Sequence, residues 1–296
     1  MWLRKALFQI HLWSGLGLGL YVLLISLTGS ILVYRNELYM AATPAPIVVS
    51  GAGTRLTDNQ LKDAARRAYP GYTVSMLNRP GDPNEAVSIS LARGADRKNR
   101  NFHPFTGADL GDSVPLGIWM VSKLLQLHDD LLGGPMGRAI NGALALLLVA
   151  LTLTGFVVWW PGIRSWRRSL AIPRNAGPQR FIWGLHSMLG FWTFAVILLF
   201  AVSGVYLGDP ERFQDVADRI QPLTAANARS RLVDQVIYWL AYLHVGRING
   251  IGLGCSGPGL CDAAVKFAWA FFGLAPAVMF VTGALMWWNR VMRRRR

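Results

Sequence analysis

The chain has 296 residues, 52% of them hydrophobic, and a formal net charge of +14 at pH 7. That length suits one membrane domain with one modest soluble domain. The basic excess does not indicate a nucleic-acid partner, because it is concentrated beside the apolar stretches and the remaining basic residues nearly balance the acidic ones.

Four long stretches contain no charged residue: 6–34, 139–160, 181–208 and 267–289. They predict four membrane-spanning helices, at 6–34, 136–160, 181–208 and 264–289. Each reaches the roughly 20 residues that an apolar helix needs to cross the hydrocarbon core and contact lipid. The first stretch resembles a signal peptide, but its apolar run exceeds the roughly 7–15 residues of a cleavable one, so we expect an uncleaved anchor. The fold class expected is therefore a mainly α membrane protein with a four-helix transmembrane bundle.

Basic residues mark one side of the membrane. They precede the first span, fill the loop at 161–180 and form the tail at 290–296: Arg4, Lys5, Arg164, Arg167, Arg168, Arg174, Arg180, Arg290 and Arg293 to Arg296. Under the positive-inside rule, both termini and this loop are cytoplasmic, so 37–112 and 209–262 lie on the outer side.

The segment 37–112 is polar and predicts a small α+β domain. Thr57 and Gln60 form a capping-box pattern before a helix that ends at Pro70-Gly71. Strands are expected at 73–77, 86–91 and 101–105. Next, apolar residues at helical spacing over 115–132 predict an amphipathic helix at the outer membrane interface.

The outer segment 209–262 carries a second such helix and a loop with the two cysteines, Cys255 and Cys261. In an oxidising compartment, a short structural disulfide is the favoured interpretation. A thiol metal site or a redox relay is the alternative, although neither cysteine belongs to a CxxC motif.

An internal repeat relates the two halves of the chain. His11 precedes Gly15 by four positions and Gly29 by eighteen, and His186 has the same spacing to Gly190 and Gly204. Further matching pairs are Leu127-His128 with Leu243-His244, and Gly137-Arg138 with Gly246-Arg247. These matches predict two duplicated helix pairs.

The repeat places four histidines in equivalent positions, where titratable groups are costly and suggest function. Eighteen helical residues span roughly 27 Å, so His11 should meet His186 near one membrane face and His128 should meet His244 near the other. A lone histidine near a helix end is more often an ordinary hydrogen-bonded interface residue, but four in register favour ligands. His103, which has no repeat partner, is expected to be structural.

Two facing imidazoles suit the axial positions of a haem iron, whereas zinc would need more ligands. Gly15 and Gly190 would let a flat macrocycle approach the helix backbone. We therefore expect two bis-histidine haem b groups. Cationic side chains at matching depth would pair with haem propionates: Arg4, Lys5 and Arg180 on the inner side, Arg138 and Arg247 on the outer side.

These residues resemble the PepSY-associated transmembrane proteins, a bacterial inner-membrane family that includes haem-containing ferric-siderophore reductases. The resemblance is carried by His11 with Thr28-Gly29, by Leu127-His128, by 243–247 and by the two Thr-Gly segments that end in Trp-Trp. The outer domain looks like a PepSY unit, although that family often has an acidic or amide residue where His103 stands.

The resemblance implies transmembrane electron transfer by an oxidoreductase. A cytoplasmic flavoprotein or the quinol pool would be the donor, and a periplasmic acceptor, in the first place a ferric siderophore, would be reduced so that Fe(II) is released. Two other functions stay open: a non-redox membrane sensor or protease-regulating module, suggested by the outer domain, and a small metal transporter, suggested by the intramembrane histidines.

Overall fold

The computed structural model describes residues 2–51, 53–160, 170, 172, 177–224 and 231–294. Contacts divide the chain into two compact units, each described by itself below. The helical unit comprises Met1–Arg35 and Lys123–Arg296, and the α+β unit comprises Asn36–Ser122. Most of the basic loop expected at 161–180, with Arg164, Arg167, Arg168 and Arg174, lies outside the described residues, as do Arg295 and Arg296.

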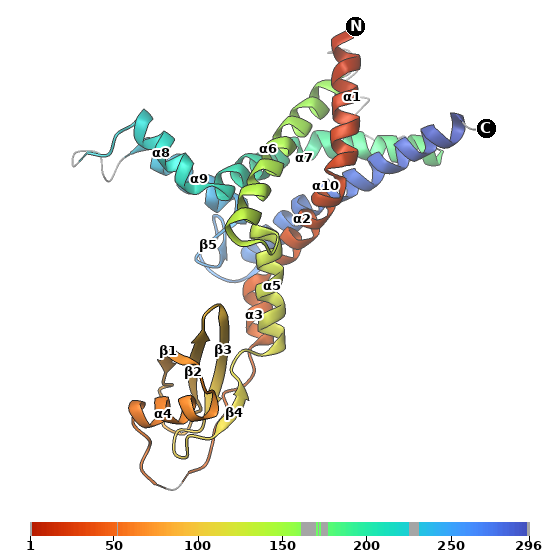
Figure 1. Ribbon diagram of the computed structural model, residues 1–296. Helices are drawn as coiled ribbons and strands as arrows, with labels where there is room; N and C mark the ends of the chain where they lie inside the picture. Colours follow the sequence, from red (N-terminus) through yellow and green to blue (C-terminus); the bar gives the residue numbers. More distant parts are fainter. Residues whose placement is uncertain are drawn as a thin grey trace. The chain divides into compact units, whose positions relative to one another are not determined.

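Three helices of the helical unit are long and apolar enough to cross a membrane (Figure 1). They are α6 (Gly134–Trp159), α7 (Pro178–Gly208) and α10 (Leu260–Arg294). A helix satisfies its backbone polar groups internally, which is what an apolar run in lipid requires. Within the described residues, the chain is thus a membrane protein with three such helices and one bent pair.

The bent pair replaces the continuous first span expected at 6–34. It consists of α1 (Trp2–Gly17) and α2 (Gly19–Leu32), which meet at an angle of 62°. Backbone hydrogen bonds of 2.8 Å flank the break, from the Leu18 amide to the Ser14 carbonyl and from the Val22 amide to the Leu18 carbonyl. Glycines around Leu18 weaken helix propensity, and such Gly and Ser positions are common sites of helix bending.

The helices pack through small residues. In the helical unit, α6 packs on α7, α2 on α10, α1 on α6, and α7 contacts both α10 and α9 (Leu232–Val245). A Cβ on Gly142 of α6 would lie 3.0 Å from the Cα of Gly208 on α7, so these backbones are close enough to exclude a larger side chain. Such contacts are typical of helix association in membranes.

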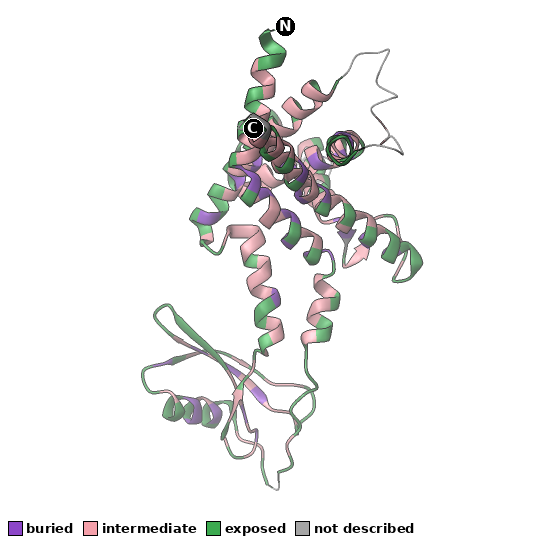
Figure 2. Ribbon diagram, turned by 90° about the vertical axis from the view of Figure 1, so that its right-hand side faces the viewer, coloured by how far each residue is buried: buried purple, intermediate pink, exposed green. Residues whose placement is uncertain are grey.

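The outward faces of the long helices are apolar rather than polar. Figure 2 shows that few residues of the three long helices are buried. The exposed side chains include Leu146, Leu147, Trp192 and Phe267. Apolar side chains that project away from a bundle have a favourable environment in lipid. The pattern therefore agrees with membrane contact around this unit.

Shorter elements complete the described part of the helical unit. Helix α8 (Pro210–Ile220) follows α7, and the two-stranded hairpin of β5 (Arg247–Ile248) and β6 (Ile251–Gly252) follows α9. Cys255 and Cys261 form a disulfide between the segment after β6 and the start of α10. Helix α5 (Leu116–Asp130) corresponds to the interface helix expected at 115–132.

The α+β unit is an antiparallel sheet in the order β1-β2-β3-β4, with helix α4 (Asp58–Ala68) on one face. The strands are β1 (Thr73–Asn78), β2 (Val87–Arg93), β3 (Asp96–Phe102) and β4 (Asp109–Asp112), and α3 (Arg35–Ala42) precedes them. Leu61, Val87, Ile89 and Phe102 are fully buried between helix and sheet. The expected capping box of Thr57 and Gln60 starts α4.

The prediction of a third strand at 101–105 was wrong. The third strand, β3, ends at Phe102, and the closing strand, β4, begins only at Asp109. A two-residue turn with Gly94 at φ 60° joins β2 to β3, which lets the polar segment Asp96–Phe102 pair along the whole of β2. The charged sequence of β3 lacks the alternation of apolar and polar residues that is typical of a strand. Backbone pairing with β2, rather than this alternation, therefore determines where β3 forms.

Candidate functional site

The four repeated histidines come together as two pairs. The first pair is His11 on α1 with His186 on α7, whose ring centroids are 6.4 Å apart. The second pair is His128 on α5 with His244 on α9, with ring centroids 6.3 Å apart. The pairing is the one that the repeat predicted.

The two pairs lie far apart along the bundle. His186 is near the start of α7, and Ser203, which contacts His244, is near its end. The helix is continuous between them, so these seventeen residues correspond to roughly 25 Å. One pair therefore lies towards each end of the helix.

In the first pair, Nδ1 of each imidazole contacts a carbonyl oxygen. The Nδ1 atom of His11 lies 3.1 Å from the Leu151 carbonyl oxygen. That of His186 lies 2.9 Å from the Met279 carbonyl oxygen and 3.0 Å from the Thr282 hydroxyl. A carbonyl oxygen only accepts, so in both neutral rings Nδ1 carries the hydrogen and Nε2 carries the lone pair.

In the second pair, Nδ1 contacts hydroxyl groups, and the imidazoles also form backbone hydrogen bonds, His128 with Ile25 and His244 with Phe200. The Thr28 hydroxyl lies 3.0 Å from Nδ1 of His128, and the Ser203 hydroxyl lies 2.7 Å from Nδ1 of His244. Both hydroxyl-bearing residues are buried. Asn141 on α6 adds support, because its side-chain amide donates to the backbone carbonyl of His128 at 2.8 Å.

Glycines give the rings their space. A Cβ on Gly29 or on Gly155 would lie 2.8 Å from Cε1 of His128 or of His11, respectively. At Gly283 the corresponding distance to Cε1 of His186 is 3.4 Å. Glycine is therefore required at Gly29 and Gly155 for the imidazoles to keep these positions.

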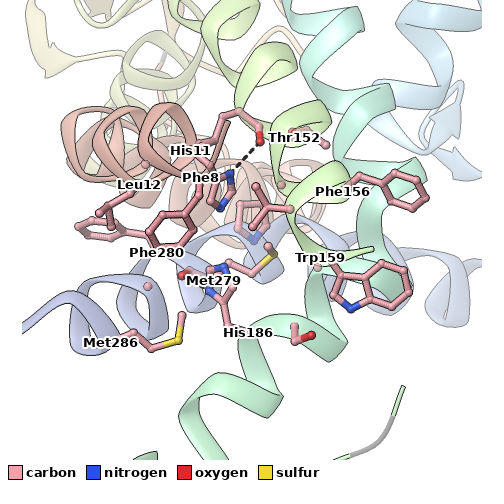
Figure 3. A pocket seen from close by; sticks show the side chains of 18 of the residues that line it. Phe8, His11, Leu12, Thr152, Phe156, Trp159, His186, Met279, Phe280 and Met286 are labelled. Carbon is pink, nitrogen blue, oxygen red and sulfur yellow. Dashed lines mark hydrogen bonds between the residues drawn. The ribbon is translucent and has the colours of Figure 1, made fainter. Parts of the chain in front are cut away.

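A cavity of about 480 Å³ surrounds the first pair. Figure 3 shows His11 and His186 extending into it from different helices, with Trp159 and Phe156 along one side. The volume is within the range of small-molecule and cofactor sites. Gly15 and Gly190, which were expected to let a flat group approach, both line this cavity.

Two buried donors in the cavity lack a hydrogen-bond partner among the described residues. They are the Ser187 hydroxyl and the indole nitrogen of Trp159. Buried polar groups without partners are uncommon in proteins and ask for an explanation. A bound group with acceptor atoms would supply the missing partners.

The cationic side chains expected near the histidine pairs lie in different environments. Among the described residues, Arg4 lines the cavity, and so does Arg290, whereas Lys5 and Arg180 are not among the lining residues. Near the second pair, Arg138 forms an ion pair with Asp129. Arg247 is buried and donates to the Leu32 carbonyl at 2.8 Å.

His103 lies in the α+β unit and has a different role. Its Nδ1 accepts hydrogen bonds from the backbone amides of Phe105 at 3.2 Å and Thr106 at 3.3 Å. These contacts cap the turn before β4. The structural role expected for His103 agrees with this geometry.

Sequence reasoning missed the hydroxyl partners Thr28, Ser203 and Thr282, together with Arg290. A signal for the hydroxyls was present, because each is followed by glycine: Thr28-Gly29, Ser203-Gly204 and Thr282-Gly283. Arg290 gave no such signal, because it belongs to the basic tail that topology alone explains.

Together, these observations define a helical membrane protein with two pairs of neighbouring histidines and an α+β unit. A family profile described as the PepSY-associated TM region matches residues 8–290, so the chain belongs to that family. It is also similar to the uncharacterized protein PA4219 of Pseudomonas aeruginosa, with 31% identity over 88 residues. That stretch covers 29% of this chain and only 21% of the relative.

Proposed function

We propose that the protein is a dihaem b-type electron carrier of the bacterial inner membrane. It would pass electrons from a cytoplasmic flavoprotein or the quinol pool to a periplasmic acceptor, in the first place a ferric siderophore. When bound, haem would supply a one-electron Fe(III)/Fe(II) couple at each histidine pair.

The observation that carries the proposal is the ring separation in both pairs. One iron bonded to a nitrogen of each imidazole, at about 2 Å per bond, would hold the ring centroids roughly 6 Å apart. The distances of 6.4 and 6.3 Å match that requirement. The two pairs, which occupy equivalent positions of the repeat, have nearly the same separation.

The donor set supports iron in a macrocycle over a metal held by protein alone. In the part of the chain that the structure describes, no group of three or more His, Cys, Asp or Glu residues is placed to hold a metal ion. A haem would need only two imidazole nitrogens from the protein. The available lone pairs on Nε2 of His11 and His186 meet that need.

The residues around the first pair suit the rest of the cofactor. The cavity is largely apolar and aromatic, which fits the macrocycle, and Gly15 and Gly190 keep its walls flat. Arg4 and Arg290 could neutralise propionate groups, and the Ser187 hydroxyl could donate to them.

We further propose four spans built from two duplicated helix pairs, with α1 and α2 together forming the first. Both termini would be cytoplasmic, because Arg4, Lys5 and Arg290 flank the spans on the same side. The first histidine pair would then be near the cytoplasm and the second near the periplasm, with the α+β unit outside. An electron could thus cross the membrane between two fixed centres.

Vesicle experiments would test this function. Proteoliposomes that enclose dithionite, with a ferric siderophore and a Fe(II)-specific chelator outside, should release Fe(II) when the wild-type protein carries haem. His186→Ala should abolish that release, and His103→Ala should not change it. Equal rates with His186→Ala, or metal flux that persists without haem, would overturn the proposal, the latter in favour of a transporter.

A further inference from the structure

The second histidine pair is held by two buried hydroxyl groups whose own hydrogens are already used. The Thr28 hydroxyl donates to the Leu24 carbonyl at 2.8 Å, and the Ser203 hydroxyl donates to the Leu199 carbonyl at 2.6 Å. These are bonds to the residue four positions earlier in the same helix. A hydroxyl has only one hydrogen to give.

Each hydroxyl must therefore accept from the histidine that it touches. Nδ1 of His128 and Nδ1 of His244 are the donors across 3.0 and 2.7 Å. In the neutral rings, the lone pair then lies on Nε2. An imidazole whose Nδ1 hydrogen is engaged in this way is oriented for a metal, and its basicity as a ligand is raised.

We propose that Thr28 and Ser203 are positioning residues that fix the tautomer and ligand strength of the second histidine pair. This inference rests on the proposed function, because it concerns the iron that the pair would hold. Stronger donation from Nε2 favours Fe(III) over Fe(II), so the two hydroxyls lower the reduction potential of this centre.

All four histidines have a backbone hydrogen-bond partner, and the hydroxyl contact is an addition that His128, His186 and His244 share. The Thr282 hydroxyl contacts Nδ1 of His186 at 3.0 Å and donates to the Val278 carbonyl at 2.9 Å, as in the second pair. Thr154 occupies the equivalent Thr-Gly motif near His11, but its hydroxyl donates to the Ala150 and Leu151 carbonyls. Nδ1 of His11 contacts the Leu151 carbonyl oxygen instead of a hydroxyl group.

Thr154 therefore provides a matched control. Thr154→Val removes a half-buried hydroxyl in the same motif without removing the acceptor that His11 uses. Thr28→Val and Ser203→Ala remove the hydroxyl acceptors of His128 and His244 and leave the backbone hydrogen bonds to Ile25 and Phe200 in place. Thr28→Ser and Ser203→Thr restore a hydroxyl at each position.

The experiment is a redox titration of the full-length, haem-loaded protein, with electron paramagnetic resonance of the oxidised form. Ser203→Ala and Thr28→Val should raise the midpoint potential of one of the two haems, change its resonance, and weaken its binding on the order of 10-fold. The serine and threonine exchanges should restore the wild-type values. Thr154→Val should leave both haems unchanged.

The other haem reports folding within each variant. Selective loss of one haem in Ser203→Ala or Thr28→Val would support the inference, because only the ligand would have been disturbed. Unchanged potential and resonance in both variants would overturn it, as would an equal change with Thr154→Val. Wild-type protein without haem would instead refute the proposed function on which the inference rests.

Discussion

The helical unit and the α+β unit use histidine in opposite ways. In the helical unit, Nδ1 of His11 donates to a backbone carbonyl, which leaves Nε2 available as a ligand. In the α+β unit, Nδ1 of His103 accepts hydrogen bonds from two backbone amides. The hydrogen of the neutral ring is therefore on Nε2. The hydrogen-bond partner of Nδ1, rather than the presence of a histidine, distinguishes a potential metal ligand from a structural residue.

The two units also differ in what their interiors enclose. The α+β unit has a closed core in which Leu61, Val87, Ile89 and Phe102 are fully buried. The helical unit instead surrounds a cavity between its first two paired histidines. Substitutions of the paired histidines and of the residues that position them should therefore alter cofactor binding, whereas those in the α+β unit should alter only its stability.

The largest effect is expected from the loss of one ligand. His186→Ala removes half of the first pair and should eliminate about half of the b-type absorbance, because a haem with one axial imidazole missing loses its low-spin spectrum. Reduced-minus-oxidised absorption spectra would measure it. His103→Ala is the control and should retain the full absorbance. Equal loss of absorbance in both variants would contradict the different roles assigned to His186 and His103.

A smaller effect is expected from a misplaced ring. Gly155→Ala would put a Cβ 2.8 Å from Cε1 of His11 and should displace the imidazole, lowering haem affinity on the order of 10-fold. Haem titration followed by absorption would measure this. Gly17→Ala is the matched control in the helical unit, because a Cβ there meets nothing within 4 Å. A weakened site with Gly17→Ala but not with Gly155→Ala would contradict the assigned geometry.

Acid should weaken the α+β unit through Asp109. Burial raises the pKa of this carboxyl, but hydrogen bonds from Arg100 and Tyr69 lower it more, so the net pKa lies below its usual value. A lowered folded-state pKa stabilises the fold above the unfolded-state pKa, near 3.8, and this stabilisation is lost as the pH falls through the folded-state value. Hydrogen exchange of the β2 and β3 amides in the full-length protein should therefore accelerate below about pH 4.

Asp109→Asn should remove that pH dependence and cost about 1 kcal/mol of local stability at neutral pH. Asp63→Asn is the control, because Asp63 pairs with Arg66 at an exposed position, where an ion pair contributes little. Haem absorbance should not change in either variant. An acid response in the exchange of the long helices alone would contradict the assignment to the α+β unit.

The smallest effect concerns the turn that His103 caps. His103→Ala removes an acceptor for two backbone amides and should destabilise the α+β unit by about 0.5 kcal/mol. His103→Asn offers a carbonyl oxygen in its place and should restore most of that stability. Hydrogen exchange of β4 would measure both. Equal exchange in the two variants would show that the cap contributes nothing.

The apolar runs predicted the long helices, because membrane spans have the strongest composition signal of any element. The repeat predicted which histidines meet, since duplication fixes equivalent positions. The bend at Leu18 could not be derived, because the glycines allow a break without requiring one. Strand β3 was misplaced because backbone pairing with β2, which no local pattern reports, determines its register.

Within the site, Nδ1 partners depend on how helices far apart in the sequence pack. The Ser203 hydroxyl contacts His244 from α7, forty-one positions earlier in the chain, and the Thr282 hydroxyl contacts His186 from α10. The sequence showed the hydroxyl-glycine motifs, but it did not show which histidine each one faces. The cations that line the cavity were harder to predict, because the positive-inside rule alone already explains Arg4 and Arg290 beside the membrane spans.

The central claim is that two histidine pairs each hold one haem, and cofactor stoichiometry tests it most directly. Full-length protein expressed with ample haem and purified from membranes should yield two b-type haems per chain by pyridine haemochrome absorption. Its oxidised spectrum should be low-spin and should change on reduction. Colourless protein, or haem whose amount does not depend on His11, His128, His186 and His244, would contradict the account.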